Sequence, residues 1–400
     1  MASTLAPPPL QDASSPRPAA TLPTAAGLAA ATRTGTARTA APVPATPPRR
    51  RSTRDPFVDL VRAGGTLGVL TVHWLMPQVA WDGTALTIGN SLSHGAGWLV
   101  TWVLQVLPLL FFAAGAAAGL EPVRPVVTVL RRRLPRLLVP VLALLGTWLA
   151  AAVLLPLLGV PQTAVGQAVR IVPQPLWFLG VYLALVVLSP LLRRLVGVLG
   201  WGAPAVLTAV PVAVDLLRFS GVAPGLAWLN LLAVWAVPFT IGLAYARRGE
   251  PRTGARTWWV SSAVALLTLV ALIGAGPYPI SLIGMPGDAI SNLGPPTLVA
   301  LVHAVLLTSV LLALRTPLTR LATGPARHAL AWVSARSMTI YLWHLTAMFT
   351  VIGVGLLGLG LTVPAAGTLA WFGQWPLWCA AAAGVLAVLV RVYHRFEQRR

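Results

Sequence analysis

The sequence of 400 residues has one cysteine, no lysine and only nine acidic residues. A single cysteine excludes a disulfide framework and a cysteine-rich metal site. Charged residues make up 10% of the chain, whereas a soluble domain has about 25%. This composition argues against an ordinary soluble enzyme.

Hydrophobic residues are abundant instead, at 56% of the chain, and all 29 basic residues are arginines. The net charge of +20 would indicate a nucleic-acid partner only if the basic residues gathered on solvated faces. Here the arginines interrupt long apolar stretches, which is the pattern of a membrane protein. We therefore predict a polytopic protein of the lipid bilayer with no nucleic-acid partner.

Residues 1–55 are rich in Ala, Pro, Thr and Arg and show no sustained apolar periodicity. Such a segment cannot bury enough surface to offset the entropy of ordering, and it lacks the apolar core of a signal peptide. We predict a disordered cytoplasmic tail over 1–55 and a transmembrane domain over 56–400. The abundance of Ala, Arg, Gly and Pro is also typical of a GC-rich bacterial genome.

Apolar stretches long enough to cross a bilayer, about 20 residues each, recur from Phe57 onward with short connectors. We predict an all-α transmembrane bundle of about ten helices. The fifth span is interrupted by two prolines, Asp215 and Arg218. The ten predicted centres lie near Leu67, Phe111, Leu145, Leu183, Thr208, Phe239, Leu267, Leu306, Ala347 and Gly384.

The arginines test this count, because the cytoplasmic loops of membrane proteins are enriched in basic residues. With the tail in the cytoplasm, the outer connectors hold only Arg170 and Arg218, and Arg62 lies inside the first span. All other arginines fall on the cytoplasmic side. An even number of spans also returns the C-terminus to the cytoplasm. We therefore predict a multi-pass protein of the cell membrane with both termini inside.

Ionisable side chains within a span are costly and indicate functional sites. In the first span, Arg62 and His73 lie about 16 Å apart along one helical face, with Asp59 one turn before Arg62. Histidine suits general-base catalysis near neutral pH, and arginine binds phosphate or carboxylate groups. This pattern favours a site that takes an anionic ligand from the cytoplasm and moves a proton within the membrane. Alternatively, Arg62 reaches the lipid headgroups and His73 bonds a neighbouring helix.

Four polar residues share one face of the ninth span, namely Ser334, Ser337, Tyr341 and His344. They either line a cavity or bond across helices. The arginines that precede the third span could bind phosphates, although the positive-inside rule also accounts for them. These are Arg131, Arg132, Arg133 and Arg136. No metal is expected, since no two histidines lie at i and i+4 and acidic residues are few.

Several segments occur in an order that resembles one family. Asp59-Leu-Val-Arg62, followed by His73, resembles the first-helix signature of the acyltransferase-3 family of integral membrane acyltransferases. Further matches are Pro108–Gly115, Arg131–Pro140, Leu176–Leu179, Tyr341–His344 and the loop Ser291–Thr297, which is similar to a loop of actinobacterial members. The resemblance covers about residues 55–395, and Ala114 stands where the family commonly has serine.

The resemblance implies transfer of an acyl group, often acetyl, from cytoplasmic acyl-CoA to an acceptor hydroxyl at the outer side. Family acceptors include cell-surface polysaccharides, lipid-linked sugars and glycosylated metabolites, so O-acetylation of such a carbohydrate is expected. His73 would be the catalytic histidine and Arg62 its partner. The donor would be held by Arg132, Arg133 and Arg136. The substrate cavity would be lined by Asp59, Trp177, Tyr341 and His344.

Two alternatives remain open at the level of sequence. A transporter or flippase of a lipid-linked precursor would use the same cavity but form no covalent bond. Within the acyltransferase interpretation, His73 either acts as a general base for direct transfer or carries the acyl group itself.

Overall fold

The computed structural model describes residues 55–249 and 254–398. The predicted N-terminal tail lies outside the described residues, apart from Asp55. The Asp55 carboxylate accepts a hydrogen bond of 2.9 Å from the backbone N–H of Phe57 and so caps the first helix. Its second oxygen accepts a hydrogen bond of 2.8 Å from the Tyr245 hydroxyl, which ties the start of the first helix to the ninth.

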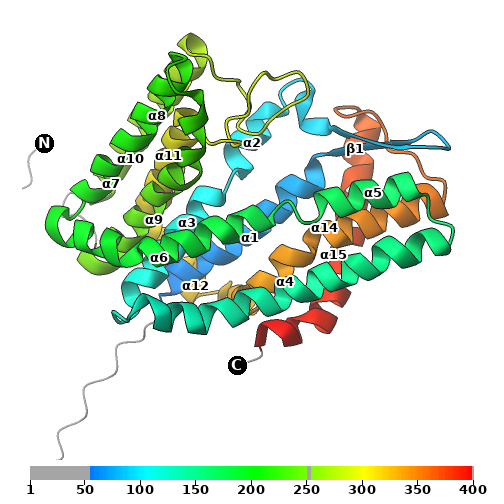
Figure 1. Cartoon of the computed structure of the whole chain (residues 1–400), viewed down its shortest axis with the longest axis horizontal. Helices are drawn as coiled ribbons and strands as arrows, with labels where there is room; N and C mark the ends of the chain where they lie inside the picture. The colour runs from blue at the N-terminus through cyan, green and yellow to red at the C-terminus, as the bar shows by residue number, and fades with distance from the viewer. Residues whose placement is uncertain (1–54, 250–253, 399–400) are drawn as a thin grey trace, which may run out of the picture. The chain divides into compact units, whose positions relative to one another are not determined.

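Helices dominate the described residues (Figure 1). In the first half of the chain they are α1 (Pro56–Leu75), α2 (Trp98–Leu104), α3 (Leu107–Leu120), α4 (Val126–Leu157), α5 (Gln162–Ile171), α6 (Leu176–Leu199), α7 (Gly202–Leu207) and α8 (Ala209–Phe219). The second half forms α9 (Asn230–Arg248), α10 (Gly254–Ala275), α11 (Leu298–Ala313), α12 (Arg315–Thr323), α13 (Arg327–Ala335), α14 (Ser337–Ile352) and α15 (Leu369–Gln398). Short 3-10 turns are η1 (Ser91–Ser93) and η2 (Pro224–Leu229), and the π-helical turn η3 (Gly353–Gly358) follows α14.

The prediction of an all-α membrane bundle is confirmed. In the described part of the chain, eight helical segments are long and apolar enough to cross a membrane, and a ninth is added if α11 and α12, bent by 63°, count as one span. Nine of the ten predicted centres fall within helices, and Thr208 lies at the break between α7 and α8.

The predicted first span, α1, is not among these nine segments, because its polar residues lower its mean hydropathy. It has 20 residues and packs against α3, α12, α13 and α14. One flank is thus covered by α3 and another by α14, so most of its length contacts protein rather than lipid. A helix with ionisable side chains is tolerated within a membrane protein when other helices cover it in this way.

The closest helix pair is α3 with α9, and glycine permits the approach. A Cβ atom added to Gly115 would lie 1.8 Å from the carbonyl oxygen of Phe239, and one added to Gly242 would lie 2.0 Å from the carbonyl oxygen of Phe112. Small residues at such a crossing let two backbones come into van der Waals contact. Gly115 and Gly242 therefore allow the close approach of α3 and α9.

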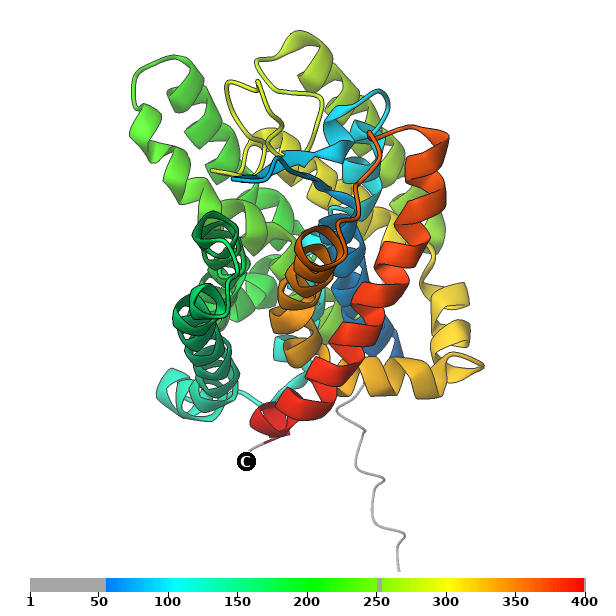
Figure 2. The same cartoon turned by 90° about the vertical axis from the view of Figure 1, so that its right-hand side faces the viewer.

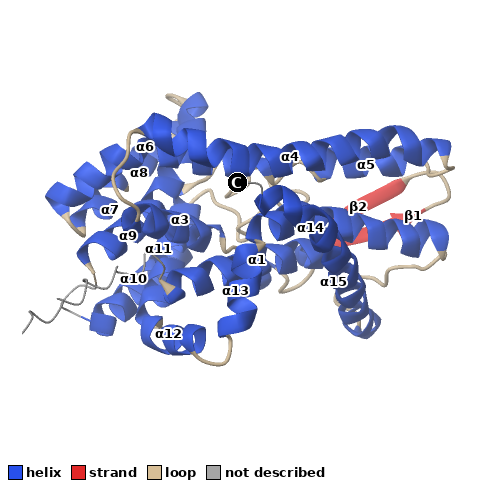
Figure 3. Cartoon of the chain, turned by 90° about the horizontal axis from the view of Figure 1, so that it is seen from below, coloured by secondary structure: helices blue, strands red, loops and turns tan. Residues whose placement is uncertain are grey.

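The connector after α1 forms a β-hairpin that was not predicted from the sequence. The strands β1 (Pro77–Trp81) and β2 (Leu86–Asn90) pair antiparallel. At the turn, one Asp82 oxygen accepts hydrogen bonds from Thr84 and the backbone N–H of Ala85, and Gly83 takes a positive φ of 97°. The hairpin lies beside α5 at one end of the bundle (Figure 3).

The interrupted fifth span forms two short helices, α7 and α8. Its buried carboxylate, that of Asp215, has its hydrogen-bonding capacity satisfied by three donors. Asp215 accepts hydrogen bonds from the Asn230 side chain (3.0 Å), the Tyr278 hydroxyl (3.0 Å) and the backbone N–H of Leu298 (2.6 Å). Three donors from three segments satisfy a charge that would otherwise destabilise the bundle. Asp215 is therefore a structural connection between α8, α9 and the start of α11.

Candidate active site

A cavity of about 540 Å³ lies beside α1 and is walled by α3, α4, α6, α13 and α14. Its polar lining comes mainly from Arg62 and Thr66 of α1, Arg133 and Arg136 of α4, and Tyr341 of α14. Its volume is within the range of about 300–1,000 Å³ that is usual for small-molecule sites. We call it the arginine cavity.

The structure separates the nine predicted site residues into two groups. Those that line the arginine cavity are Arg62, Arg133, Arg136 and Tyr341. Those that do not are Asp59, His73, Arg132, Trp177 and His344. The second group is not scattered, however, because four of its members contact the first group directly or through one side chain.

Arg62 lies at the cavity wall with its guanidinium 3.7 Å from the Asp59 carboxylate. The Arg62 side chain is 36% exposed, whereas that of Asp59 is 16% exposed. The carboxylate therefore sits behind the guanidinium and restrains it on the face of α1 that the cavity uses. Asp59 acts on the cavity through Arg62 rather than by lining it.

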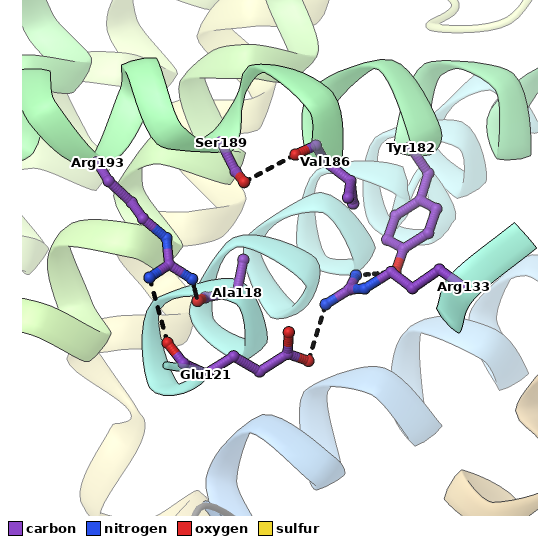
Figure 4. Close-up of polar contacts among 7 residues, drawn as sticks. All are labelled: Ala118, Glu121, Arg133, Tyr182, Val186, Ser189 and Arg193. Atoms are coloured by element: carbon purple, nitrogen blue, oxygen red, sulfur yellow. Dashed lines mark hydrogen bonds and ion pairs between the residues drawn. The ribbon is translucent and has the colours of Figure 1, made fainter. Parts of the chain in front are cut away.

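Arg133 is fixed by two side chains from other elements (Figure 4). Its guanidinium donates to the Glu121 carboxylate at 2.8 Å and to the Tyr182 hydroxyl of α6. Arg193 of α6 donates to the backbone carbonyls of Ala118 and Glu121 at the C-terminal end of α3, where the helix presents unpaired carbonyls. The end of α3 is thus clamped between α4 and α6, and the position of Arg133 is set.

Arg136 and Arg132 differ in a way that the sequence does not reveal. Arg136 lines the arginine cavity and makes no hydrogen bond or ion pair within the described residues. Both residues are exposed, but Arg132 does not line the cavity. Of the two, Arg136 has a guanidinium free to bind an anion there.

Two acidic residues in the cavity wall, Glu121 and Glu397, were missed at the level of sequence. Glu397 of α15 accepts hydrogen bonds from the backbone N–H groups of Met338 (3.3 Å) and Thr339 (3.1 Å). Its carboxylate therefore caps the N-terminus of α14, where unpaired N–H groups and the helix dipole favour negative charge. Only its position near the C-terminal end of a long apolar helix signals that role, and that signal is weak.

The imidazole rings of His73 and His344 meet between α1 and α14, with centroids 4.9 Å apart. The Nδ1 atom of His73 lies 2.7 Å from the carbonyl oxygen of Val69, and that of His344 lies 2.6 Å from the carbonyl oxygen of Tyr341. A carbonyl oxygen only accepts, so each Nδ1 carries the proton. Each Nε2 is then the unprotonated nitrogen, which is the form that a general base requires.

Tyr341 connects the arginine cavity to this histidine pair. Its ring lines the cavity and lies 5.9 Å from the His344 ring, centroid to centroid. Its hydroxyl donates to the carbonyl oxygen of Pro175 at 2.8 Å, so this proton is not available to donate to a ligand in this structure. Tyr341 is a wall between the cavity and the histidines rather than a hydrogen-bond donor directed at a ligand.

Trp177 lies outside the cavity, with its ring packed against Phe178 and Trp235. Phe178, the next residue, lines the cavity. The remaining intramembrane histidine, His303, is buried and bonded to the Trp102 carbonyl oxygen at 2.7 Å. Among the described residues, no three His, Cys, Asp or Glu side chains gather as a metal site.

The fold and the cavity define a multi-pass membrane protein whose helices surround a basic hollow next to two histidines. A family model described as an acyltransferase domain, Acyl_transf_3, matches residues 55–394. The chain belongs to this family, and the protein is a membrane acyltransferase. No curated protein and no solved structure matches the chain. Acyl transfer is covalent chemistry, so the family does not support the alternative of a transporter or flippase.

Proposed function

We propose that the protein moves an acyl group, most simply acetyl, from acyl-CoA to a hydroxyl of a carbohydrate, glycolipid or glycosylated metabolite. One observation supports the proposal. Three arginines, Arg62, Arg133 and Arg136, line one cavity, and Tyr341 in the wall of this cavity lies next to the histidine pair. An anionic donor and a base are thereby held on neighbouring surfaces.

The donor occupies the arginine cavity in this proposal. Acyl-CoA carries a pyrophosphate and a 3′-phosphate, and guanidinium groups bind phosphate through charge-assisted hydrogen bonds. Arg136 has no partner among the described residues, and it is the strongest candidate for a phosphate contact. Arg133 shares its charge with Glu121, so its main effect is to shape the wall. Arg132 is exposed beside the cavity and contributes only to the positive electrostatic potential around it.

His73 acts as the general base. Its Nε2 takes the proton of the acceptor hydroxyl as the hydroxyl oxygen attacks the thioester carbonyl. The carbon–sulfur bond then breaks, the electron pair leaves with the CoA sulfur, and the proton passes from His73 to that sulfur. This sequence forms one ester, releases CoA and returns the histidine to its starting state.

The two substrates approach from opposite sides in this proposal. The arginine-rich loops favour the cytoplasmic face, which is where acyl-CoA is available, and both termini would lie on that face in the cell membrane. The acceptor would then reach His73 from the outer side. No enzyme-bound cofactor or metal is needed, because the donor is itself a substrate.

The test uses the purified full chain in lipid nanodiscs with acetyl-CoA labelled in its acetyl group. Label is expected in a glycoside acceptor, with one free CoA formed for each ester. CoA release without an ester would contradict the acceptor class, and no use of acetyl-CoA at all would contradict the donor. The His73→Ala variant, folded as judged by size-exclusion chromatography, is the matched inactive control.

A further inference from the structure

A second, smaller hollow lies near the β-hairpin, where α14 and α15 run side by side (Figure 2). It has a volume of about 50 Å³. Four tryptophans form much of its wall, together with one glutamine; they are Trp74, Trp371, Trp375, Trp378 and Gln374. We call it the tryptophan pocket. None of its lining residues, all of which lie in the described part of the chain, is charged.

The histidine pair separates this pocket from the arginine cavity along α1. Arg62 and Thr66 line the arginine cavity, His73 follows, and Trp74 and Pro77 then line the tryptophan pocket. The Trp74 indole donates to the His344 carbonyl oxygen at 3.0 Å, so the wall of the pocket is bonded to the second histidine.

The helix α14 repeats the same order. Its residues Ser337 and Tyr341 line the arginine cavity, His344 contacts His73, and Met348 and Ile352 line the tryptophan pocket. Two hollows on opposite sides of one histidine pair match a reaction that joins two substrates. Because only the arginine cavity carries charge, the two hollows suit ligands of different chemistry.

The polar atoms of the tryptophan pocket indicate which chemistry it suits. The Gln374 amide nitrogen donates to the Thr362 carbonyl oxygen at 3.2 Å, which fixes the amide. Its Oε1 is buried and accepts no hydrogen bond within the described residues. The Gln374 oxygen is a fixed acceptor for a neutral hydroxyl group.

Tryptophan rings and amide oxygens together recognise parts of sugars, because an aromatic face packs on their C–H groups while the amide accepts from a hydroxyl. We propose that the tryptophan pocket is the acceptor site and takes the hydroxyl-bearing arm of a neutral hexose. The volume suits an arm rather than a ring, since one molecule of liquid water occupies about 30 Å³. This inference rests on the proposed function, and it adds the place where the acceptor binds and narrows the acceptor to a neutral hexose.

The chain provides its own reporter, because its one cysteine, Cys379, lines the pocket. The experiment follows modification of Cys379 by methyl methanethiosulfonate in wild-type protein in nanodiscs, with methyl glycosides of glucose, galactose, mannose and N-acetylglucosamine as probes. At about ten times its Kd, a bound glycoside should slow the modification about tenfold. The 6-deoxy glycoside, which lacks the hydroxyl of the arm, is the control and should protect less.

Three results would overturn the assignment of the pocket. The first is unchanged modification with all four glycosides, and the second is equal protection by the 6-deoxy control. The third is protection by acetyl-CoA alone, which would assign the pocket to the donor's acyl group. This measurement needs no turnover, so it separates the pocket from the proposed function: protection without acyl transfer supports the pocket and contradicts the reaction.

Variants give a second, kinetic readout for whichever glycoside is acylated. Gln374→Leu and Trp375→Leu should each raise the KM for the glycoside about tenfold, since a site loses discrimination when a hydroxyl partner is removed, and should leave the KM for acetyl-CoA unchanged. Trp228→Leu, at a 65% exposed tryptophan outside the pocket, is the matched control. Equal glycoside KM values in wild type and both pocket variants would overturn the proposal even if His73→Ala is inactive.

Discussion

His73 of α1 and His344 of α14 form an edge-to-face pair of imidazoles, with ring centroids 4.9 Å apart and planes inclined by 63°. Each ring is held by a hydrogen bond from its Nδ1 to a carbonyl of its own helix. The Nε2 of His344 is buried and has no hydrogen-bond partner within the described residues. These two fixed rings, with an unpartnered nitrogen on one of them, are the feature from which the kinetic predictions on the proposed mechanism follow.

Removal of the His73 imidazole should abolish acyl transfer. His73→Ala is expected to lower kcat by about 10²–10⁴-fold, the usual contribution of a positioned general base. Label transfer from acetyl-CoA to a glycoside measures this. His94→Ala, at an exposed histidine in the loop after η1, is the control and should keep wild-type kcat. A His73→Ala enzyme with more than a tenth of wild-type kcat would contradict the assignment of the base.

His344 is expected to be a positioning residue that acts through His73. In the proposed mechanism the His73 ring becomes positively charged when it takes the acceptor proton, and the His344 ring, with its unpartnered Nε2, lies 4.9 Å away between centroids and can stabilise that charge. His344→Leu should therefore lower kcat about 10–100-fold, the equivalent of one hydrogen bond to a charged group, without changing the KM for acetyl-CoA.

His344→Gln keeps an acceptor oxygen near the position of Nε2, so it should restore a large part of the activity lost in His344→Leu. A merely structural role makes no such distinction, since both variants remove the buried ring. If the leucine and glutamine variants have the same kcat, or if both change KM instead, the positioning role is wrong.

The two neighbouring arginines of α4 provide a matched pair for donor binding. Both are exposed, but Arg136 lines the arginine cavity and Arg132 does not. Arg136→Ala should raise the KM for acetyl-CoA about tenfold or more, since a charge-assisted hydrogen bond to phosphate is lost. Arg132→Ala should leave it near the wild-type value. Initial rates over a range of acetyl-CoA concentrations give the two KM values. Equal effects of the two substitutions would mean that the donor is attracted by the overall positive charge of α4 and not by a contact with Arg136 in the cavity.

The sequence predicts the bundle well because a bilayer imposes a simple rule. Apolar runs about 20 residues long have few alternatives to a spanning helix, so nine of ten centres fall in helices. The hairpin Pro77–Asn90 was missed because a short connector carries no hydrophobic period, although its Asp82-Gly83 pair is a turn signal. A turn signal of two residues does not by itself predict the strands on either side of it.

The site was predicted less completely, and the reason is geometric. The spacing of Arg62 and His73 shows that they share a helical face, but it does not show that Tyr341 would separate the two side chains into different surroundings. Likewise, Arg132 and Arg136 look equivalent in a basic run until α4 turns one toward the cavity. Glu121 and Glu397 face the cavity only because of where α3 and α15 end.

The crossing of α3 and α9 should be the most sensitive point of the fold to small substitutions. A methyl group at Gly115 would lie 1.8 Å from the Phe239 carbonyl oxygen, and a backbone atom cannot yield as a side chain can. Gly115→Ala should therefore lower stability by about 1–3 kcal/mol, as overpacking does. Gly146→Ala in α4, where an added Cβ meets nothing within 4 Å, should instead be neutral or stabilise by up to about 1 kcal/mol. Thermal unfolding of the two variants in the same detergent, followed by tryptophan fluorescence, should give a lower Tm for Gly115→Ala alone. A Gly115→Ala protein as stable as the Gly146→Ala protein would show that α3 and α9 are not in backbone contact in the membrane.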